Sequence, residues 1–145
     1  MTQVDFYTNV EDKLATTCKL CAKALEAKLR VLVYTPDAQL SDKLSRLMWS
    51  TPQTGFLPHC SADDKLAAVT PVIIEHRSEN NPMHDEVLLN LRDQLPQCFS
   101  RFQRVIELVG TEEADRVAAR ERFRFYRDRG YPLNTHDLGG SRAQR

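Results

Sequence analysis

The stretch RVAARERFRFYRDR, residues 116–129, carries the residue types that most clearly suggest binding chemistry: six arginines interleaved with two phenylalanines and a tyrosine. Wound as an α-helix at about 100° per residue, it gathers on one face Arg116, Arg120, Phe123, Arg124 and Arg127. Arginine pairs carboxylates or phosphates in a bidentate manner and stays charged at any relevant pH. This face therefore predicts a site for an acidic ligand.

The opposite face of the same predicted helix collects the side chains that we expect to pack on a core: Ala114, Val117, Ala118 and Phe125. Two acids, Glu121 and Asp128, also fall on that side, so we expect them to neutralise the arginines poorly. A basic run on a helix is also commonly no more than a solvated face. The spacing alone leaves both interpretations open.

The overall charge narrows the choice of acidic ligand. The 145 residues include 20 basic and 20 acidic side chains, so the formal net charge is zero. A protein held to duplex DNA by phosphate contacts is normally basic as a whole. A local arginine stripe on a neutral chain is better suited to a small acidic partner such as a peptide tail, and we expect no tight direct binding of nucleic acid.

The N-terminal residues MTQVDFYTNVEDK include acids and no apolar run, so they do not resemble a signal peptide. No stretch approaches the roughly 20 apolar residues that span a bilayer. Four cysteines without a secretory signal indicate a reducing compartment and free thiols. We therefore expect a cytoplasmic protein with no membrane contact.

Apolar patterns alternate between strand and helix periodicity along the chain. Strands are predicted at 4–8, 30–35, 71–76, 86–91 and 104–109, and helices at 10–28, 36–48, 62–68, 95–102 and 112–129. Thr35 and Thr111 are the expected caps of two of these helices, and 77–82 is an expected turn. This order predicts a single three-layer α/β domain, residues 1–138, with a mostly parallel Rossmann-like sheet and helices on both faces. Residues 139–145 are expected to be a disordered tail.

The glycines argue against a nucleotide cofactor, although the predicted fold resembles a nucleotide binder. None of the five glycines belongs to a G-x-G-x-x-G or G-x-x-x-x-G-K-[ST] motif, and neither early strand-to-helix junction has a glycine. Without glycine the backbone does not easily approach a phosphate. We expect a domain that lacks phosphate-binding glycine loops.

Other chemistries find little support in the sequence. Cys18 and Cys21 have the C-x-x-C spacing of a redox pair or of half a zinc site, for which His59 and Cys60 are the available partners. Both cysteines nevertheless fall inside the apolar stripe of the first predicted helix, where cysteine behaves as a small hydrophobe. No nucleophile motif and no acid–base pair stand out. We expect no metal, no cofactor and no enzymatic activity.

A second feature is the segment 49–59, which holds the only tryptophan, Trp49, followed by Phe56 and Leu57 among prolines and polar residues. Large aromatic side chains in irregular surface segments can anchor a protein partner. They can equally fold back over the preceding helix. The residues leave both interpretations open.

Two blocks of this sequence resemble the chi subunit of bacterial DNA polymerase III. ARERFRFYRDRGYPLNT, residues 119–135, is similar to the C-terminal signature of that family, and MWSTPQTGFLPH, residues 48–59, to its tryptophan-containing loop. The VDFYT and RVLVYT strands lie at matching places, so the resemblance covers essentially the whole chain. It implies a non-enzymatic accessory protein of the clamp-loader complex. Such a protein binds the psi subunit and the acidic C-terminal tail of single-stranded DNA-binding protein (SSB), which ends in an apolar residue with a free carboxylate.

The resemblance also implies roles for individual residues. Arg120 and Arg124 would hold the carboxylates of the tail, and Arg116 and Arg127 extend the same stripe. The pocket for the last side chain of the tail would be formed by Phe123, Val109 and Leu133, with Asn134 and Thr135 completing the motif. Trp49 and Phe56 match the aromatics that contact psi, where a helicase-like repair protein competes in some bacteria.

Two residues depart from the family pattern, because Phe123 stands where tyrosine is common and Arg124 where lysine is familiar. The main alternative is a module that binds single-stranded nucleic acid directly through arginine and aromatic stacking.

Overall fold

The computed structural model describes residues 2–50, 58–61, 66, 70–76, 84–96 and 98–138. These residues form one sheet in the strand order β3-β4-β2-β5-β6-β1-β7, and every pair of neighbouring strands is parallel. The strands are β1 (Gln3–Val10), β2 (Val31–Tyr34), β3 (His59–Ser61), β4 (Val72–Glu75), β5 (Val87–Asn90), β6 (Arg104–Gly110) and β7 (Leu133–Asp137). The helices are α1 (Lys13–Glu26), α2 (Ala38–Ser50), the 3₁₀ turn η2 (Phe99–Arg101) and α3 (Glu113–Asp128).

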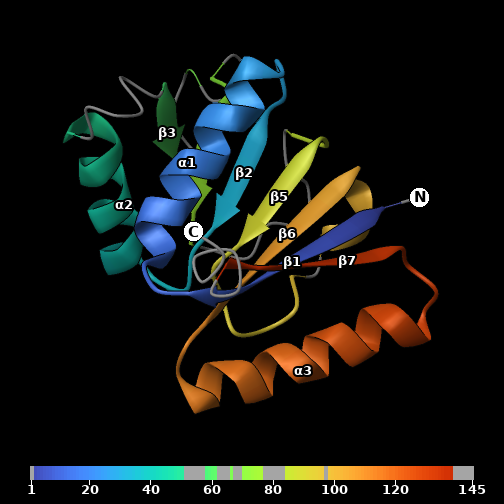
Figure 1. Cartoon of the computed structure of the whole chain (residues 1–145). Coiled ribbons are helices and arrows are strands. Elements are labelled where there is room, and N and C mark those ends of the chain that lie inside the picture. The colour runs from blue at the N-terminus through green and yellow to red at the C-terminus, as the bar shows by residue number, and fades with distance from the viewer. Residues whose placement is uncertain are drawn as a thin grey trace.

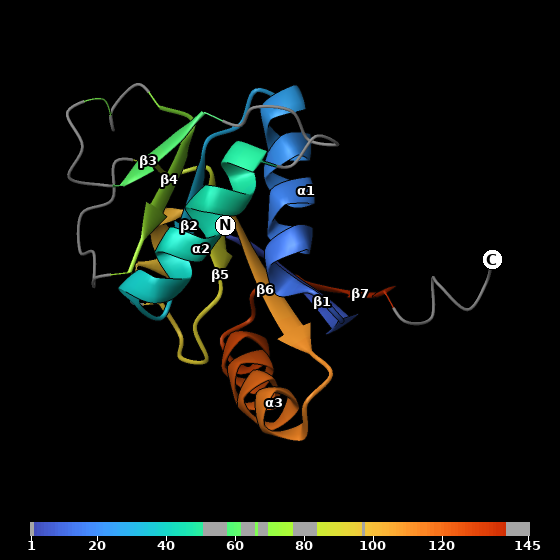
Figure 2. The same cartoon turned by 90° about the vertical axis from the view of Figure 1, so that its left-hand side faces the viewer.

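Helices cover both faces of the sheet, as Figures 1 and 2 show, so the predicted three-layer α/β fold is confirmed. Successive residues of the buried strands point to opposite faces. In β2, Val31 and Val33 pack in the same apolar cluster as residues of α1 and α2. Leu32 and Tyr34 pack with residues of η2 and α3. A strand buried on both sides is therefore apolar at every position, which explains the unbroken run of apolar residues in this segment.

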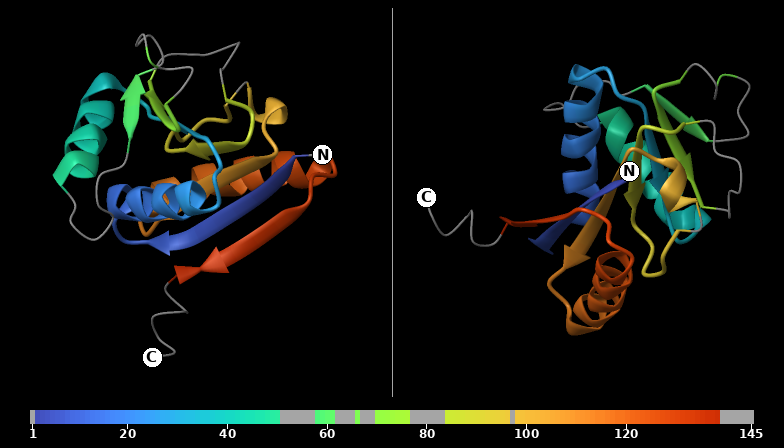
Figure 3. Two further views of the ribbon diagram at one scale, coloured as in Figure 1. Left: turned by 90° about the horizontal axis from the view of Figure 1, so that it is seen from above. Right: turned by 90° about the vertical axis from the view of Figure 1, so that its right-hand side faces the viewer.

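The connections after β1 and β6 leave the sheet on opposite faces. The chain passes from β1 through α1 to β2 on one face, and from β6 through α3 to β7 on the other. Because β1 and β6 are neighbours, their carboxyl ends form the point where the direction of winding reverses. Figure 3 shows β7 beside β1 at the edge of the sheet, with α3 close by.

The ends of the helices differ from the predictions. The side chain of Asp37, and not that of Thr35, caps α2 by accepting a hydrogen bond from the Leu40 N–H at 2.8 Å. Thr35 is buried, and its hydroxyl lies 2.5 Å from that of Ser41. At α3 the cap position belongs to Glu112 and not to Thr111.

Two strands were not predicted, and one predicted helix is shorter than expected. β3 has three residues, and β7 has the polar sequence LNTHD, so neither has an apolar signal. The helix predicted at 95–102 reduces to η2. Phe56, most of the predicted helix at 62–68, the predicted turn at 77–82 and the predicted tail lie outside the described residues.

The buried face of α3 is rotated from the predicted one. Its buried residues are Ala119, Arg122 and Tyr126, whereas Ala114 and Val117 are exposed. The ring of Tyr126 lies in edge-to-face contact with those of Phe6, Phe99 and Tyr131. Because burial of one large aromatic ring outweighs burial of several alanine methyl groups, the tyrosine determines which side of the helix faces the sheet. Among the described helices, none is both long and apolar enough to span a membrane.

Candidate functional site

A cleft of about 450 Å³ lies between α3 and the strands β1, β6 and β7. The residues that line it are Phe6, Thr8, Asn9, Val109, Gly110, Arg116, Ala119, Arg120, Phe123 and Thr135. They come from four elements: β1 near the N-terminus and the consecutive elements β6, α3 and β7. The connection from β6 through α3 to β7 brings them together, because it packs the helix against one face of the sheet, beside the strands β6, β1 and β7.

The floor of the cleft is apolar. The rings of Phe6 and Phe123 lie edge to face, with centroids 5.3 Å apart. Val109 and Ala119 are buried beside them in the cluster that packs under α3. Phe123 is only partly buried, so one part of its ring remains exposed toward the cleft. An apolar or aromatic side chain of a ligand can therefore be buried here.

The rim of the cleft is cationic. Arg116 and Arg120 are exposed, and no acidic residue is among the described residues that line the cleft. Arg116 Nη2 donates to Asn9 Oδ1 at 3.1 Å, and Arg120 Nη2 forms an ion pair with Glu113 at 3.1 Å. The Arg120 and Glu113 side chains are 58% and 70% exposed, so solvent screens this pair and a ligand carboxylate can replace Glu113 at little cost.

Of the residues predicted to form the site, the structure brings together Val109, Arg116, Arg120, Phe123 and Thr135. Leu133 packs against the core cluster under α3, and Asn134 is an exposed residue of β7. Strand alternation explains why Thr135 lines the cleft while its neighbour Asn134 does not.

The remaining two arginines of the predicted stripe lie on α3 outside the cleft lining. Arg124 pairs with Glu121 and Arg127 with Asp128, at 3.1 and 3.2 Å. The expectation that these two acids neutralise the stripe poorly was wrong. A helical wheel shows where a side chain leaves the helix, but a long arginine side chain can bend back to a carboxylate one or three positions away, as these two pairs do.

Several cleft residues were not predicted as site residues. Phe6 and Thr8 fall within the strand predicted at 4–8, but only the strand order places their side of that strand beside α3. Asn9 and Ala119 carry no pattern that marks a site. The signal for Gly110 was its position between a strand and the arginine helix.

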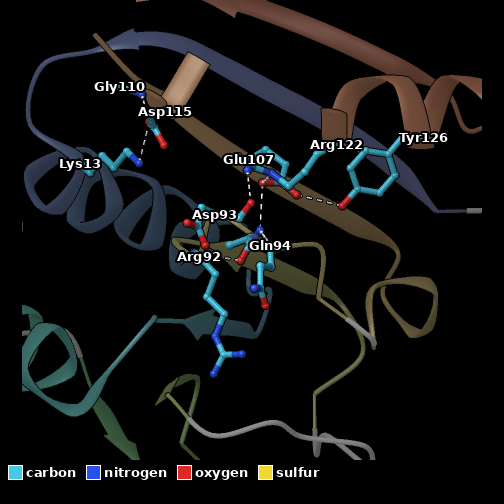
Figure 4. Close-up of polar contacts among 10 residues, drawn as sticks. Lys13, Arg92, Asp93, Gln94, Glu107, Gly110, Asp115, Arg122 and Tyr126 are labelled. Carbon is cyan, nitrogen blue, oxygen red and sulfur yellow. Dashed lines mark hydrogen bonds and ion pairs between the residues drawn. The ribbon is translucent and has the colours of Figure 1, made fainter. Parts of the chain in front are cut away.

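A buried polar network holds α3 on the sheet, as Figure 4 shows. Glu107 of β6 is fully buried and accepts hydrogen bonds from Arg122 Nε at 2.9 Å, Tyr126 Oη at 2.9 Å and Asn90 Nδ2 at 3.0 Å. Arg122 Nη1 also donates to the Asp93 carbonyl at 2.7 Å.

Burial raises the pKa of Glu107, and the Arg122 guanidinium and the three donors oppose that rise. Burial likewise raises the pKa of Tyr126, so its hydroxyl stays a donor. The only sequence signal for the network was a glutamate within the apolar run RVIELV.

A second hollow of about 450 Å³ lies at the carboxyl ends of β1 and β6, the reversal point of the sheet. Its charged lining residues are Glu11, Lys13, Asp93, Glu112 and Asp115. Ligands of parallel α/β proteins usually bind at such a point, but four acids against one lysine repel a phosphate. This arrangement agrees with the lack of glycine motifs.

Asp115 lines this second hollow, and Figure 4 shows its contacts with Lys13 and Gly110. It pairs with Lys13 at 2.8 Å and accepts a hydrogen bond from the Gly110 N–H. Burial by itself raises the pKa of Asp115, but these two donors outweigh it and hold the pKa below its usual value. A Cβ at position 110 would lie 3.0 Å from Asp115 Oδ2, so a larger residue there would require a small shift of the Asp115 carboxylate.

Trp49 lies in the last turn of α2, near the opposite edge of the sheet from the cleft, and is 64% exposed. Its ring contacts that of His59 in β3 at 5.5 Å. Both residues line a hollow of about 350 Å³, together with Ser45, Cys60 and other residues. The exposed indole does not fold back over α2 as a core residue would.

Cys18 and Cys21 lie in the core cluster under α1 and α2. Burial raises the pKa of both thiols, which disfavours the thiolate form that metal ligation and redox exchange require. Within the described residues, no three His, Cys, Asp or Glu side chains are grouped as metal ligands.

These features define a doubly wound parallel α/β protein with a cationic cleft beside its last helix and an acidic reversal point. Comparison with known families gives a more specific assignment. The model of the family "DNA polymerase III chi subunit, HolC" matches residues 1–134, and the chain belongs to this family, whose members take part in DNA replication.

Three relatives described as DNA polymerase III subunit chi are similar along most of their length. The protein from Pseudomonas aeruginosa is 35% identical over 142 residues, which cover 95% of this chain and 98% of the relative. The Escherichia coli protein is 28% identical over a match that covers 92% of this chain and 89% of the relative. The Haemophilus influenzae protein is 25% identical over a match that covers 84% of this chain and 85% of the relative.

Proposed function

We propose that this chain is a non-catalytic adaptor of the DNA polymerase III holoenzyme that binds the acidic C-terminal tail of SSB in the cleft beside α3. The observation that carries the proposal is the cleft itself, with its apolar floor at Phe6 and Phe123 and its two rim arginines, Arg116 and Arg120. A ligand that fits it combines an apolar side chain with a nearby carboxylate. A protein C-terminus that ends in an apolar residue has both groups on one residue.

The rest of the tail would lie along α3. Arg124 and Arg127 continue the row of exposed arginines from the cleft, and their partners Glu121 and Asp128 are equally exposed. Aspartates of the tail can exchange with these partners without uncovering a buried charge. Exposed ion pairs contribute at most about 1 kcal/mol each and are screened by salt, so one tail should bind weakly. Several tails presented by one SSB oligomer would raise the avidity.

The psi subunit, or a helicase-like repair protein in its place, would bind the surface around Trp49. An exposed indole beside a hollow is a common anchor for a partner chain. This surface lies near the β3 edge of the sheet, whereas the cleft lies at the β7 edge. The two partners could therefore bind together, with the rigid sheet between them.

Fluorescence polarisation tests the proposed function with two labelled probes. The first is a short acidic peptide that ends in phenylalanine with a free carboxylate, and the second is a short oligothymidine. We expect saturable peptide binding that weakens with salt, and much weaker oligonucleotide binding. Tight oligonucleotide binding without peptide binding would instead support the single-strand DNA module.

Substitution of one rim arginine makes this test specific to the cleft. Arg120→Ala should weaken peptide binding by about 1 kcal/mol, because one solvent-exposed ion pair with the ligand carboxylate is lost. Arg46→Ala is the matched control, since Arg46 is an equally charged, exposed arginine paired with Asp42 on α2. The control should leave peptide affinity unchanged.

A further inference from the structure

Asn9 has an unusual backbone conformation at the end of β1, where it lines the cleft. Its φ of 56° lies in the left-handed region, which asparagine tolerates better than most residues. Tyr7 of β1 pairs with Leu108 of β6, and the next pair is Val10 with Gly110. Two residues of β1 therefore lie opposite one residue of β6. Asn9 therefore belongs to a β-bulge, a device that redirects a side chain next to a site.

The bulge places the Asn9 amide between two charged residues from different elements. Its Nδ2 donates to Asp137 Oδ1 at 2.7 Å, at the end of β7. Its Oδ1 accepts from Arg116 Nη2 at 3.1 Å, from α3. One neutral side chain thus bonds an acid and a base and joins the two elements that flank the cleft.

The neutrality of the amide matters for the charge on the rim. A carboxylate at the same place would pair with Arg116 and cancel its charge, whereas the amide oxygen occupies one donor and leaves the charge intact. The guanidinium carries five N–H donors, so the others remain for a ligand. The amide nitrogen meanwhile donates to Asp137, so both polar atoms of the Asn9 side chain are occupied.

We propose that Asn9 is a positioning residue for the cleft, which holds the Arg116 guanidinium at the rim and keeps its charge available to an anionic ligand. This inference rests on the proposed function of the cleft. It assigns no ligand contact to Asn9 itself, because the residue acts through Arg116.

Peptide affinity in a double-mutant cycle tests this role. Asn9→Gly keeps the left-handed backbone accessible and removes the amide, so it should weaken binding of the acidic free-carboxylate peptide about three- to tenfold. In an Arg116→Ala background the same substitution should change the peptide affinity by less than about twofold, because Asn9 then has no guanidinium to position. Equal losses in both backgrounds, or no loss in either, would overturn the proposal.

Asn9→Asp is the second variant, because aspartate also tolerates the left-handed region, places a carboxylate against Arg116 and loses the donor to Asp137. We expect it to weaken peptide binding more than Asn9→Gly does and to flatten the salt dependence. Binding by Asn9→Asp equal to that of the unchanged protein would contradict the argument from charge.

An NMR measurement on the protein without peptide separates failure of this inference from failure of the proposed function. The Arg116 side-chain Nε–H should show higher mobility in Asn9→Gly than in the unchanged protein, while Arg124 serves as an internal reference. Unchanged mobility of Arg116 would overturn the positioning role even if the peptide binds. If the unchanged protein does not bind the peptide, the proposed function fails, and the mobility of Arg116 still decides whether Asn9 positions it.

Discussion

Replacing Arg122 by methionine tests how α3 is held on the sheet. The Arg122 side chain is 4% exposed and that of its partner Glu107 is fully buried, so the substitution leaves a buried carboxylate without its cation. Breaking a buried pair in this way costs about 3–5 kcal/mol. For a domain of this size each kcal/mol lowers Tm by roughly 2–4 °C, so Arg122→Met should lower it by about 6–20 °C. Such a loss is a large part of the 5–15 kcal/mol that typically stabilises a domain.

Urea unfolding followed by far-ultraviolet circular dichroism measures this loss, and Arg124→Met is the matched control. Arg124 lies on the same helix and forms an ion pair with Glu121 at 3.1 Å, but the two side chains are 56% and 67% exposed. The control should change the unfolding free energy by less than about 0.5 kcal/mol. Similar losses in both variants, or a loss below about 1 kcal/mol in Arg122→Met, would refute the reasoning.

The loss in Arg122→Met should also depend on pH. Burial raises the pKa of Glu107 above its ordinary value of 4.5, and removal of the guanidinium raises it further. A raised pKa in the folded state means that stability is retained below pH 4.5 and is lost as the pH rises through the folded pKa. The difference between the variant and the unchanged protein should therefore widen from acid toward neutral pH. Glu107→Gln in the same background should recover part of the loss.

Three further predictions concern other parts of the molecule. Glu113→Gln removes the carboxylate that competes for Arg120, so peptide affinity measured by polarisation should rise about two- to threefold, and a decrease would argue against the cleft. Trp49→Ala should leave urea unfolding and peptide affinity unchanged but weaken capture of psi in calorimetry, whereas a large loss of stability would place the indole in the core. Burial lowers the pKa of His84 below 6.5, so the unfolding free energy should decline as pH falls below 6.5, and His84→Gln should remove that decline.

The sequence was sufficient to predict the strands and helices that build the core. The apolar runs of β2, β4, β5 and β6 correspond to strands buried on both faces, which are apolar at most positions. β7 was missed because, among the described strands, it pairs with β1 alone and leaves polar side chains in solvent, so its residues need no apolar–polar alternation. Residues 133–137 form a strand because they pair with β1, and their own sequence does not show that pairing.

The site could be predicted only in part, because the sequence does not show which arginines face solvent. Arg122 and Arg124 are two positions apart and similar in context, yet one is buried on Glu107 and the other lies on the surface. The face of α3 that packs on the sheet is determined by burial of Tyr126 against Phe6, a contact between segments distant in the sequence. The backbone bulge at Asn9, likewise, has no sequence signature.

Titration of the unchanged protein with two forms of one acidic peptide tests the central claim most directly. One form ends in phenylalanine with a free carboxylate, and the other ends in the corresponding amide. If the cleft receives the end of a chain, amidation should weaken binding about ten- to a hundredfold, because it removes the charged partner of the rim arginines. Equal affinity for the two forms would contradict the account.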